Sequence, residues 1–288
     1  MLETFGARTL WAMHPDALGD LLKRGSLDAM LPDAFKALAA FGGGATAAKP
    51  VDPVRDGATV ILPLNGPLSP KGSYGGTSTE RFANQIREAG SDTSIGAIII
   101  AAMSPGGLVY GTAEAGDAVF EVRQSKPVIA VASPYSYSAS HWICTQASAY
   151  YATTSGGVGS VGVRGGHVDM SGFEDKIGMK TTLIASDPEK IAGSPYAPLT
   201  DEDRAEMQAE IDEMNQAFVA AIARGRGLDA SAVPGIHGAG RVFNSARAAA
   251  AGVTDGVMTL RDVVAKVSSS RARLALMRKR AAAMAAAF

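Results

Sequence analysis

Three short runs of apolar and β-branched residues, with helical stretches between them, constrain the fold of this chain more than any other feature. The runs are residues 59–64, 96–101 and 127–132. Continuous apolar runs of this length are typical of strands that are buried on both faces. Helices are expected between them, over residues 78–89 and 111–124. The alternation predicts an α/β fold with a parallel sheet, flanking helices and right-handed crossovers.

The sequence on either side of this alternation predicts appendages. Residues 1–41 are expected to form a helical N-terminal appendage, and residues 42–56, rich in Gly, Ala and Pro, a linker. The core domain is expected over residues 57–258. Residues 259–288 form a basic, Ala-rich helical tail in this interpretation, either a solvated helix or a helix that docks on a partner or on a membrane surface.

A long helix is expected after Thr200, which forms an approximate capping box with Asp203. The apolar residues of this helix recur every three or four positions: Met207, Ile211, Met214, Phe218 and Ile222. Such a stripe predicts packing against the core or against another subunit.

Composition disfavours several classes of protein. The 288 residues carry a formal net charge of −1, so nucleic acid and anionic membranes are not expected partners. The single cysteine, Cys144, excludes an intramolecular disulfide and a cysteine zinc cage. The four histidines lack metal-ligand spacing, and neither a metal nor a cofactor is expected. Without a long apolar run or a signal-like N-terminus, the sequence predicts a cytoplasmic protein with no membrane anchor.

Two segments that follow expected strands are candidates for chemistry. Ser104–Gly107 reads SPGG, and its glycines would let backbone amides approach and stabilise an oxyanion. Residues 135–142, YSYSASHW, begin an expected helix, so Ser138 would lie at the carboxyl edge of the sheet, where active sites of open α/β folds lie. Each segment also has an ordinary interpretation, because Pro-Gly forms turns and Ser138 could simply cap the helix.

With these segments in view, the chain resembles the signal peptide peptidase A family, and within it the phage-type branch that processes procapsid proteins. Four stretches match the motifs of the family in order: Ser104–Gly107 (SPGG), Ser138–Trp142 (SASHW), Gly159–Val163 (GSVGV) and Ser186–Asp203 (SDPEKIAGSPYAPLTDED). The resemblance covers residues 57–258 and implies a Clp-protease/crotonase-like fold.

The resemblance also implies the residues of a Ser–Lys dyad. In the family, the serine of the third motif lies 22 residues after the nucleophile, and counting back from Ser160 gives Ser138. The fourth motif implies Lys190 as the base, and Ser160 could orient its amine. The oxyanion-hole candidates that the match implies are the amides of Gly106, Gly107 and Ala139. Met103, Ser140 and His141 depart from the residues common in the family.

The function that the resemblance implies is a serine endopeptidase that forms a homo-oligomeric ring and cleaves polypeptides. Phage-type members act on capsid or scaffold proteins during head maturation, so the expected location is the bacterial host cytoplasm or the procapsid. Three alternatives stay open: a cellular peptidase that degrades signal peptides, a crotonase-like acyl-CoA enzyme and a non-proteolytic scaffold component. A Ser138–His141 dyad is an alternative mechanism, because residues three apart on a helix can share a face.

Overall fold

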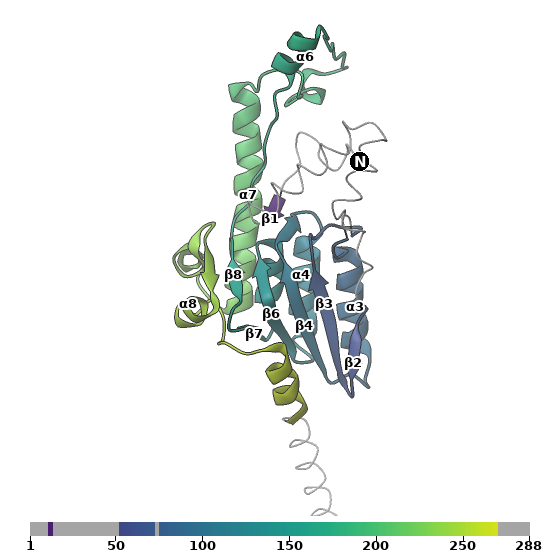
Figure 1. Ribbon diagram of the computed structural model, residues 1–288, viewed down its shortest axis with the longest axis vertical. Coiled ribbons are helices and arrows are strands. Elements are labelled where there is room, and N and C mark those ends of the chain that lie inside the picture. The colour runs from purple at the N-terminus through teal and green to yellow at the C-terminus, as the bar shows by residue number, and fades with distance from the viewer. Residues whose placement is uncertain (1–10, 14–51, 73–74, 270–288) are drawn as a thin grey trace, which may run out of the picture.

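A mostly parallel sheet forms the centre of the molecule (Figure 1). The computed structural model describes residues 11–13, 52–72 and 75–269. The sheet order is β2-β3-β4-β6-β8-β9, and β7 also pairs with β6. The strands are β2 (Val54–Asp56), β3 (Thr59–Asn65), β4 (Ala97–Ser104), β6 (Val128–Tyr137), β7 (Ala149–Ala152), β8 (Gly157–Gly159) and β9 (Val242–Asn244). Only the edge strands β2 and β9 pair antiparallel within this described sheet, so the predicted α/β class is confirmed.

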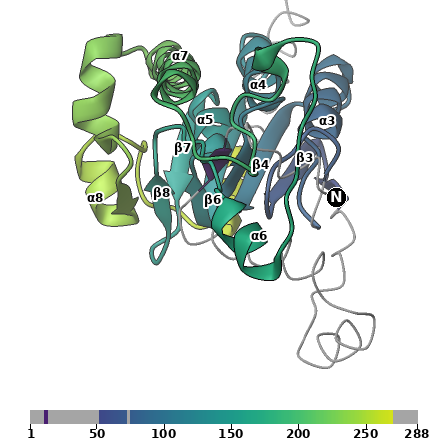
Figure 2. The same cartoon turned by 90° about the horizontal axis from the view of Figure 1, so that it is seen from above.

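Helices cover one face of the sheet, as Figure 2 shows from above. They are α3 (Thr79–Ser91), α4 (Thr112–Val122), α5 (Ala139–Thr145) and α7 (Asp201–Arg226). Ile98 and Ile100 of β4 lie in the buried cluster that holds Phe82 of α3 and Val119 of α4. Their neighbour Ile99 points to the opposite face, because successive side chains of a strand alternate.

Part of the opposite face is covered by the chain after residue 258. Residues 260–269 are helical, and Val263 packs with Ile99, Ile129 and Val131 in a separate buried cluster. This packing explains why β4 and β6 begin as unbroken apolar runs, because both faces of these two strands are buried there. One face of β3 is only half-buried. The start of the expected tail is thus helical, whereas its basic stretch, residues 271–280, lies outside the described residues.

The longest helix, α7, extends past the carboxyl edge of the sheet and carries α6 (Ser171–Ile177) at its far end (Figure 1). Its N-terminus is capped as predicted, since Thr200 Oγ1 accepts a bond of 3.0 Å from the Asp203 amide. We call residues 164–200, which lead from the sheet to this helix, the arm. The arm includes a 3₁₀ turn, η2 (Pro188–Lys190).

The apolar stripe of α7 is used largely within the chain. Phe218 and Ile222 are fully buried, and Phe218 stacks on Trp142 of α5 with ring centroids 4.6 Å apart. Met207 is also buried, while Ile211 and Met214 are half-buried against the main cluster. The stripe therefore packs on the core, and it is not the free subunit surface that the sequence left open.

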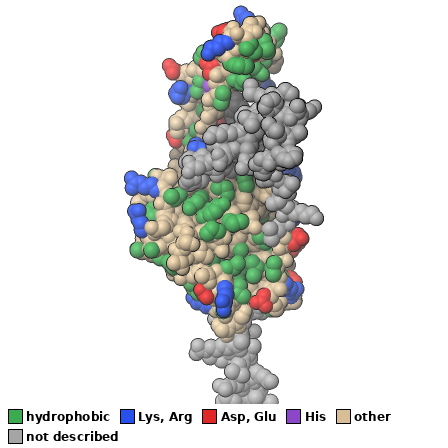
Figure 3. All heavy atoms as spheres, viewed as in Figure 1, with side chains coloured by type: hydrophobic (Ala, Val, Ile, Leu, Met, Phe, Trp, Pro, Cys, Tyr) green, Lys and Arg blue, Asp and Glu red, His purple; other side chains and the backbone are tan. Residues whose placement is uncertain are grey.

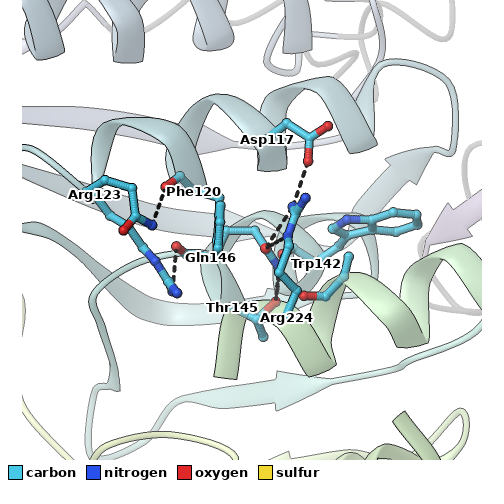
Figure 4. Close-up of polar contacts among 9 residues, drawn as sticks. Asp117, Phe120, Arg123, Trp142, Thr145, Gln146 and Arg224 are labelled. Atoms are coloured by element: carbon cyan, nitrogen blue, oxygen red, sulfur yellow. Dashed lines mark hydrogen bonds and ion pairs between the residues drawn. The ribbon is translucent and has the colours of Figure 1, made fainter. Parts of the chain in front are cut away.

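Polar side chains fix the C-terminal end of α7 to α4 and α5 (Figure 4). Arg224 Nη2 donates to Asp117 Oδ1 at 2.6 Å and to Gln146 Oε1 at 3.0 Å. Gln146 Nε2 in turn donates to the Ala221 carbonyl at 2.8 Å, and Arg123 Nη1 donates to the Gly225 carbonyl at 2.7 Å. These bonds anchor the base of the helix whose other end carries the arm.

The remaining elements are short. They are β1 (Trp11–Met13), β5 (Gly106–Leu108), the 3₁₀ turn η3 (Ala230–Ala232), the π-helical turn η4 (Pro234–Gly238) and α8 (Ser245–Ala250). Among the described residues, no helix combines the length and the apolar character needed to cross a bilayer.

Two local predictions differ from the structure. The end of the expected linker, residues 54–56, is the edge strand β2, because a short polar segment can pair along β3 without an apolar pattern. Residues 11–13 are a strand and not part of a helix, since tertiary pairing with β5 overrides local preference. The rest of the expected N-terminal appendage and linker, residues 1–10 and 14–51, lies outside the described residues.

Candidate active site

Ser138 occupies a sharp turn between the end of β6 and the start of α5. Its backbone angles are φ 54° and ψ −119°, and its amide donates to the Gly159 carbonyl at 2.8 Å. Among the described residues, Ser138 and Ser160 are the two non-glycine residues with positive φ. Such strained backbone concentrates at functional sites, and a nucleophilic serine on a strand-to-helix turn is one recurring case.

The Ser138 hydroxyl has no structural partner in the described part of the chain. Ser138 makes no capping bond to α5, and its Oγ is buried without a hydrogen bond. A buried hydroxyl left unpaired costs about 1–3 kcal/mol, so its retention needs a reason beyond folding. The interpretation of Ser138 as a simple helix cap is therefore wrong.

The serines on either side of Ser138 are engaged with each other. Ser136 Oγ and Ser140 Oγ lie 2.7 Å apart, and Ser136 Oγ also donates to Cys144 Sγ at 3.4 Å. All three side chains are fully buried, and this burial raises the pKa of the Cys144 thiol to about 12. Of the three neighbouring serines, only Ser138 has a hydroxyl that is free to react.

The SPGG segment forms the turn from β4 into β5. Ser104 Oγ donates to the Gly66 carbonyl at 2.7 Å and accepts from the Gly106 amide at 3.2 Å. Gly106 has a φ of 98°, a conformation that favours glycine. At Gly107, an added Cβ would lie 1.9 Å from the Leu68 carbonyl oxygen, so only glycine allows this close backbone approach.

The backbone of β5 directs the Gly107 amide away from Leu68. Leu68 N donates to the Gly106 carbonyl and Leu68 O accepts from the Leu108 amide, both at 2.9 Å. Because backbone groups alternate along a strand, the N–H and C=O of Gly107 point to the other edge. Ser104 of β4 pairs with Ser136 of β6, so this turn and the Ser138 turn leave the sheet side by side.

Lys190 does not meet Ser138 within one chain. It lies in η2 on the arm and is exposed. Among the described residues, Ser138 Oγ has no hydrogen-bond partner, so it makes no direct hydrogen bond with the Lys190 amine. Within one chain, the two residues that the sequence predicts as a dyad form no hydrogen bond in the described structure.

His141 points into the core. Its Nδ1 lies 3.2 Å from Tyr150 Oη and its Nε2 lies 3.0 Å from His237 Nδ1. Burial, the neighbouring His237 imidazole and the charge of Arg226 lower the pKa of His141 well below its ordinary value. Since both ring nitrogens are engaged away from Ser138, the structure contradicts the Ser138–His141 dyad. His237 lies 96 residues away, and no sequence spacing indicates this contact.

These features define an α/β protein with a candidate serine nucleophile at the carboxyl edge of a parallel sheet, beside a Gly-Gly strand. Residues 121–273, more than half of the chain, match Peptidase family S49, and the chain belongs to this family. This membership confirms the resemblance to the signal peptide peptidase A family.

Curated relatives include phage and bacterial proteases. The chain is 29% identical over 209 residues to Capsid assembly protease C of Escherichia phage lambda, covering 71% of this chain and 47% of the relative. It is 29% identical over 215 residues to Head-tail preconnector protein GP5 of Enterobacteria phage P21, covering 73% and 42%. Protease 4 of Salmonella typhi is 28% identical over 206 residues, covering 71% and 32%. The chain thus spans less than half the length of each of these relatives.

Proposed function

We propose that this protein is a serine endopeptidase in which Ser138 attacks the scissile carbonyl and Lys190 of a neighbouring copy accepts the serine proton. The observation that carries the proposal is the buried, unpaired Ser138 hydroxyl on a positive-φ turn beside β5. The exposed position of Lys190 on the arm supports a base supplied between copies.

The arm has the surface expected of a subunit interface. Exposed apolar side chains gather on it, visible at one end of the molecule in Figure 3. They are Val168, Phe173, Ile177, Met179, Leu183, Ile184, Ile191 and Tyr196, and Ile184 is 94% exposed. Apolar surface of this kind marks protein–protein contacts. Repeating one arm-to-body contact around a closed ring would bury this surface in every copy.

Burial in such a contact also supplies what the chemistry requires. A lysine acts as a base only when neutral, and desolvation in an apolar setting lowers the pKa of a lysine toward neutrality. Ser138 Oγ would then form an ester with the carbonyl carbon, and the C–N bond would break as the amine takes the proton. Water hydrolyses the ester and restores the serine.

The oxyanion of this reaction would be held by the amides of Gly107 and Ala139. Gly106 plays a different part in the proposal, because its amide already donates to Ser104. Ser104 thereby holds the turn that presents Gly107. Preorganised amides of this kind are worth about 10²–10³ in rate.

Mixing two inactive variants tests the shared site. Ser138→Ala and Lys190→Ala should each reduce cleavage of labelled casein about a thousandfold or more. If serine and lysine come from different copies, an equimolar mixture refolded together should recover about one quarter of wild-type activity, because one contact in four joins the two intact residues.

Two controls sharpen this test. Lys180→Ala removes another exposed lysine of the arm and should leave cleavage unchanged. A fluorophosphonate should label wild type but not Ser138→Ala. Recovery of no activity in the mixture, with both variants assembled, would show that the sites are not shared. Full activity of Lys190→Ala would exclude this lysine as the base.

For the substrate, we propose capsid or scaffold proteins of a phage, cut during head maturation. The names of the phage lambda and phage P21 relatives support this proposal. Incubation with purified capsid and scaffold precursor proteins of a phage should yield fragments, identified by mass spectrometry, that Ser138→Ala does not produce. Cleavage of signal peptides but not of these precursors would favour the cellular peptidase instead.

A further inference from the structure

The strand β1 pairs with the strand that carries the candidate oxyanion amide. The two strands run antiparallel, with Met13 opposite Gly106, Ala12 opposite Gly107 and Trp11 opposite Leu108. They form a two-stranded sheet of their own, apart from the central sheet. An N-terminal segment distant in sequence thus lies against β5.

The side of β5 that β1 occupies is the side needed for catalysis. Leu68 takes one edge of β5, so the N–H and C=O of Gly107 point to the edge where Ala12 lies. A substrate whose carbonyl reaches the Gly107 amide must use the same edge. The backbone of β1 and an extended substrate therefore exclude each other.

We infer that residues 11–13 of this chain act as an internal competitor at the edge of β5, the edge that an extended substrate would use. The inference rests on the proposed role of Ser138 and Gly107. Addition of a strand to a sheet edge gains affinity from main-chain hydrogen bonds, so it accepts many sequences. Residues 11–13 are apolar, with the small Ala12 opposite Gly107.

A tethered competitor acts through its local concentration. Segments of one chain meet their sites at an effective concentration in the millimolar range. If β1 occupies the edge about nine-tenths of the time, the apparent affinity for a substrate peptide falls about tenfold. Occupancy by β1 would thus keep the peptidase weakly active until the segment is displaced.

A proline at position 12 tests this inference in the full-length protein. Ala12→Pro removes the N–H that faces Gly107 and disfavours strand pairing. Ala12→Ser is the matched control, because it keeps the N–H. Both changes are made in a Ser138→Ala background, and binding of a fluorescent peptide with the sequence of residues 6–18 is followed by anisotropy. The proline variant should bind about five- to tenfold more tightly than the serine variant.

A second measurement avoids any change in the N-terminal segment. Hydrogen exchange of residues 11–13 in the Ser138→Ala protein should rise when the same peptide saturates the edge. Equal peptide affinities of the two variants, or exchange that does not change on saturation, would overturn the inference.

Measurements of KM and kcat distinguish this inference from the proposed function. With Ser138 intact, Ala12→Pro should lower KM for casein about five- to tenfold and leave kcat unchanged. The peptide could bind the Ala12 variants as expected while neither wild type nor Ala12→Pro cleaves casein or reacts with a fluorophosphonate. In that case the inference about β1 is supported and the peptidase proposal fails.

Discussion

At the scale of single residues, a chain of buried polar groups lies behind the candidate nucleophile. Tyr150, His141 and His237 are fully buried, and His237 Nε2 has no hydrogen-bond partner in the described residues. Burial, with the charge of Arg226, lowers the pKa of His237 to about 4. Both imidazoles are thus neutral at pH 7, and their hydrogen bonds join α5 to β7 and η4.

These histidines should make the folded state sensitive to mild acid. Their folded pKa values lie below the unfolded value of about 6.5, so the unfolded chain binds more protons as the pH falls. Between pH 7.5 and 5.5 the free energy of unfolding should fall by about 1–3 kcal/mol, measured by urea denaturation.

A matched pair of variants checks this assignment. His237→Gln should flatten the dependence of the free energy of unfolding on pH. His167→Gln, on the arm, removes a histidine outside the buried pair and serves as the matched control for the loss of one imidazole. An unaltered dependence in His237→Gln would contradict the assignment.

At the scale of elements, α7 has two different halves. Its C-terminal half is buried through Phe218 and Ile222 and is tied to α4 and α5 by Arg224. Its N-terminal half extends beyond the sheet and carries the apolar arm. A helix of 26 residues is about 39 Å long, so it places the arm well beyond its own sheet. The arm is therefore suited to reach another copy.

A charge on the arm should prevent assembly without unfolding the chain. Ile184 is 94% exposed, so Ile184→Asp should leave the melting temperature nearly unchanged. Light scattering coupled to size exclusion should show smaller species, with a parallel loss of casein cleavage. Ile184→Leu is the control and should keep both properties. Wild-type assembly in the Ile184→Asp protein would exclude this part of the arm from the interface.

At the scale of the whole molecule, a single chain holds the parts of the proposed site in separate places. Ser138 and Gly107 lie at the carboxyl edge of the sheet, and Lys190 lies on the arm. The chain's own β1 fills the edge of β5. Two events would then be needed for activity: assembly to supply the base, and displacement of β1 to admit a substrate. This requirement would limit cleavage by free single copies.

The central strands and the motif segments of this protein can be predicted from the order of its amino acids alone. Short apolar runs between turn residues are typical of buried strands. The predicted strands at residues 59–64, 96–101 and 127–132 are present, and each extends further at its carboxyl end. The family resemblance selected Ser138 by its offset from Ser160, and the structure distinguishes the same two serines by their positive φ. These signals are local, so they are readable in order along the chain.

Which of these segments come into contact depends on how the whole chain packs. The contact of His141 with His237, the pairing of β1 with β5 and the separation of Lys190 from Ser138 each depend on chain packing over long sequence distances. A three-residue strand has no periodicity of its own, and its conformation comes from the edge it pairs with. The position of Lys190 likewise follows from the length and anchoring of α7, which no motif around the lysine encodes.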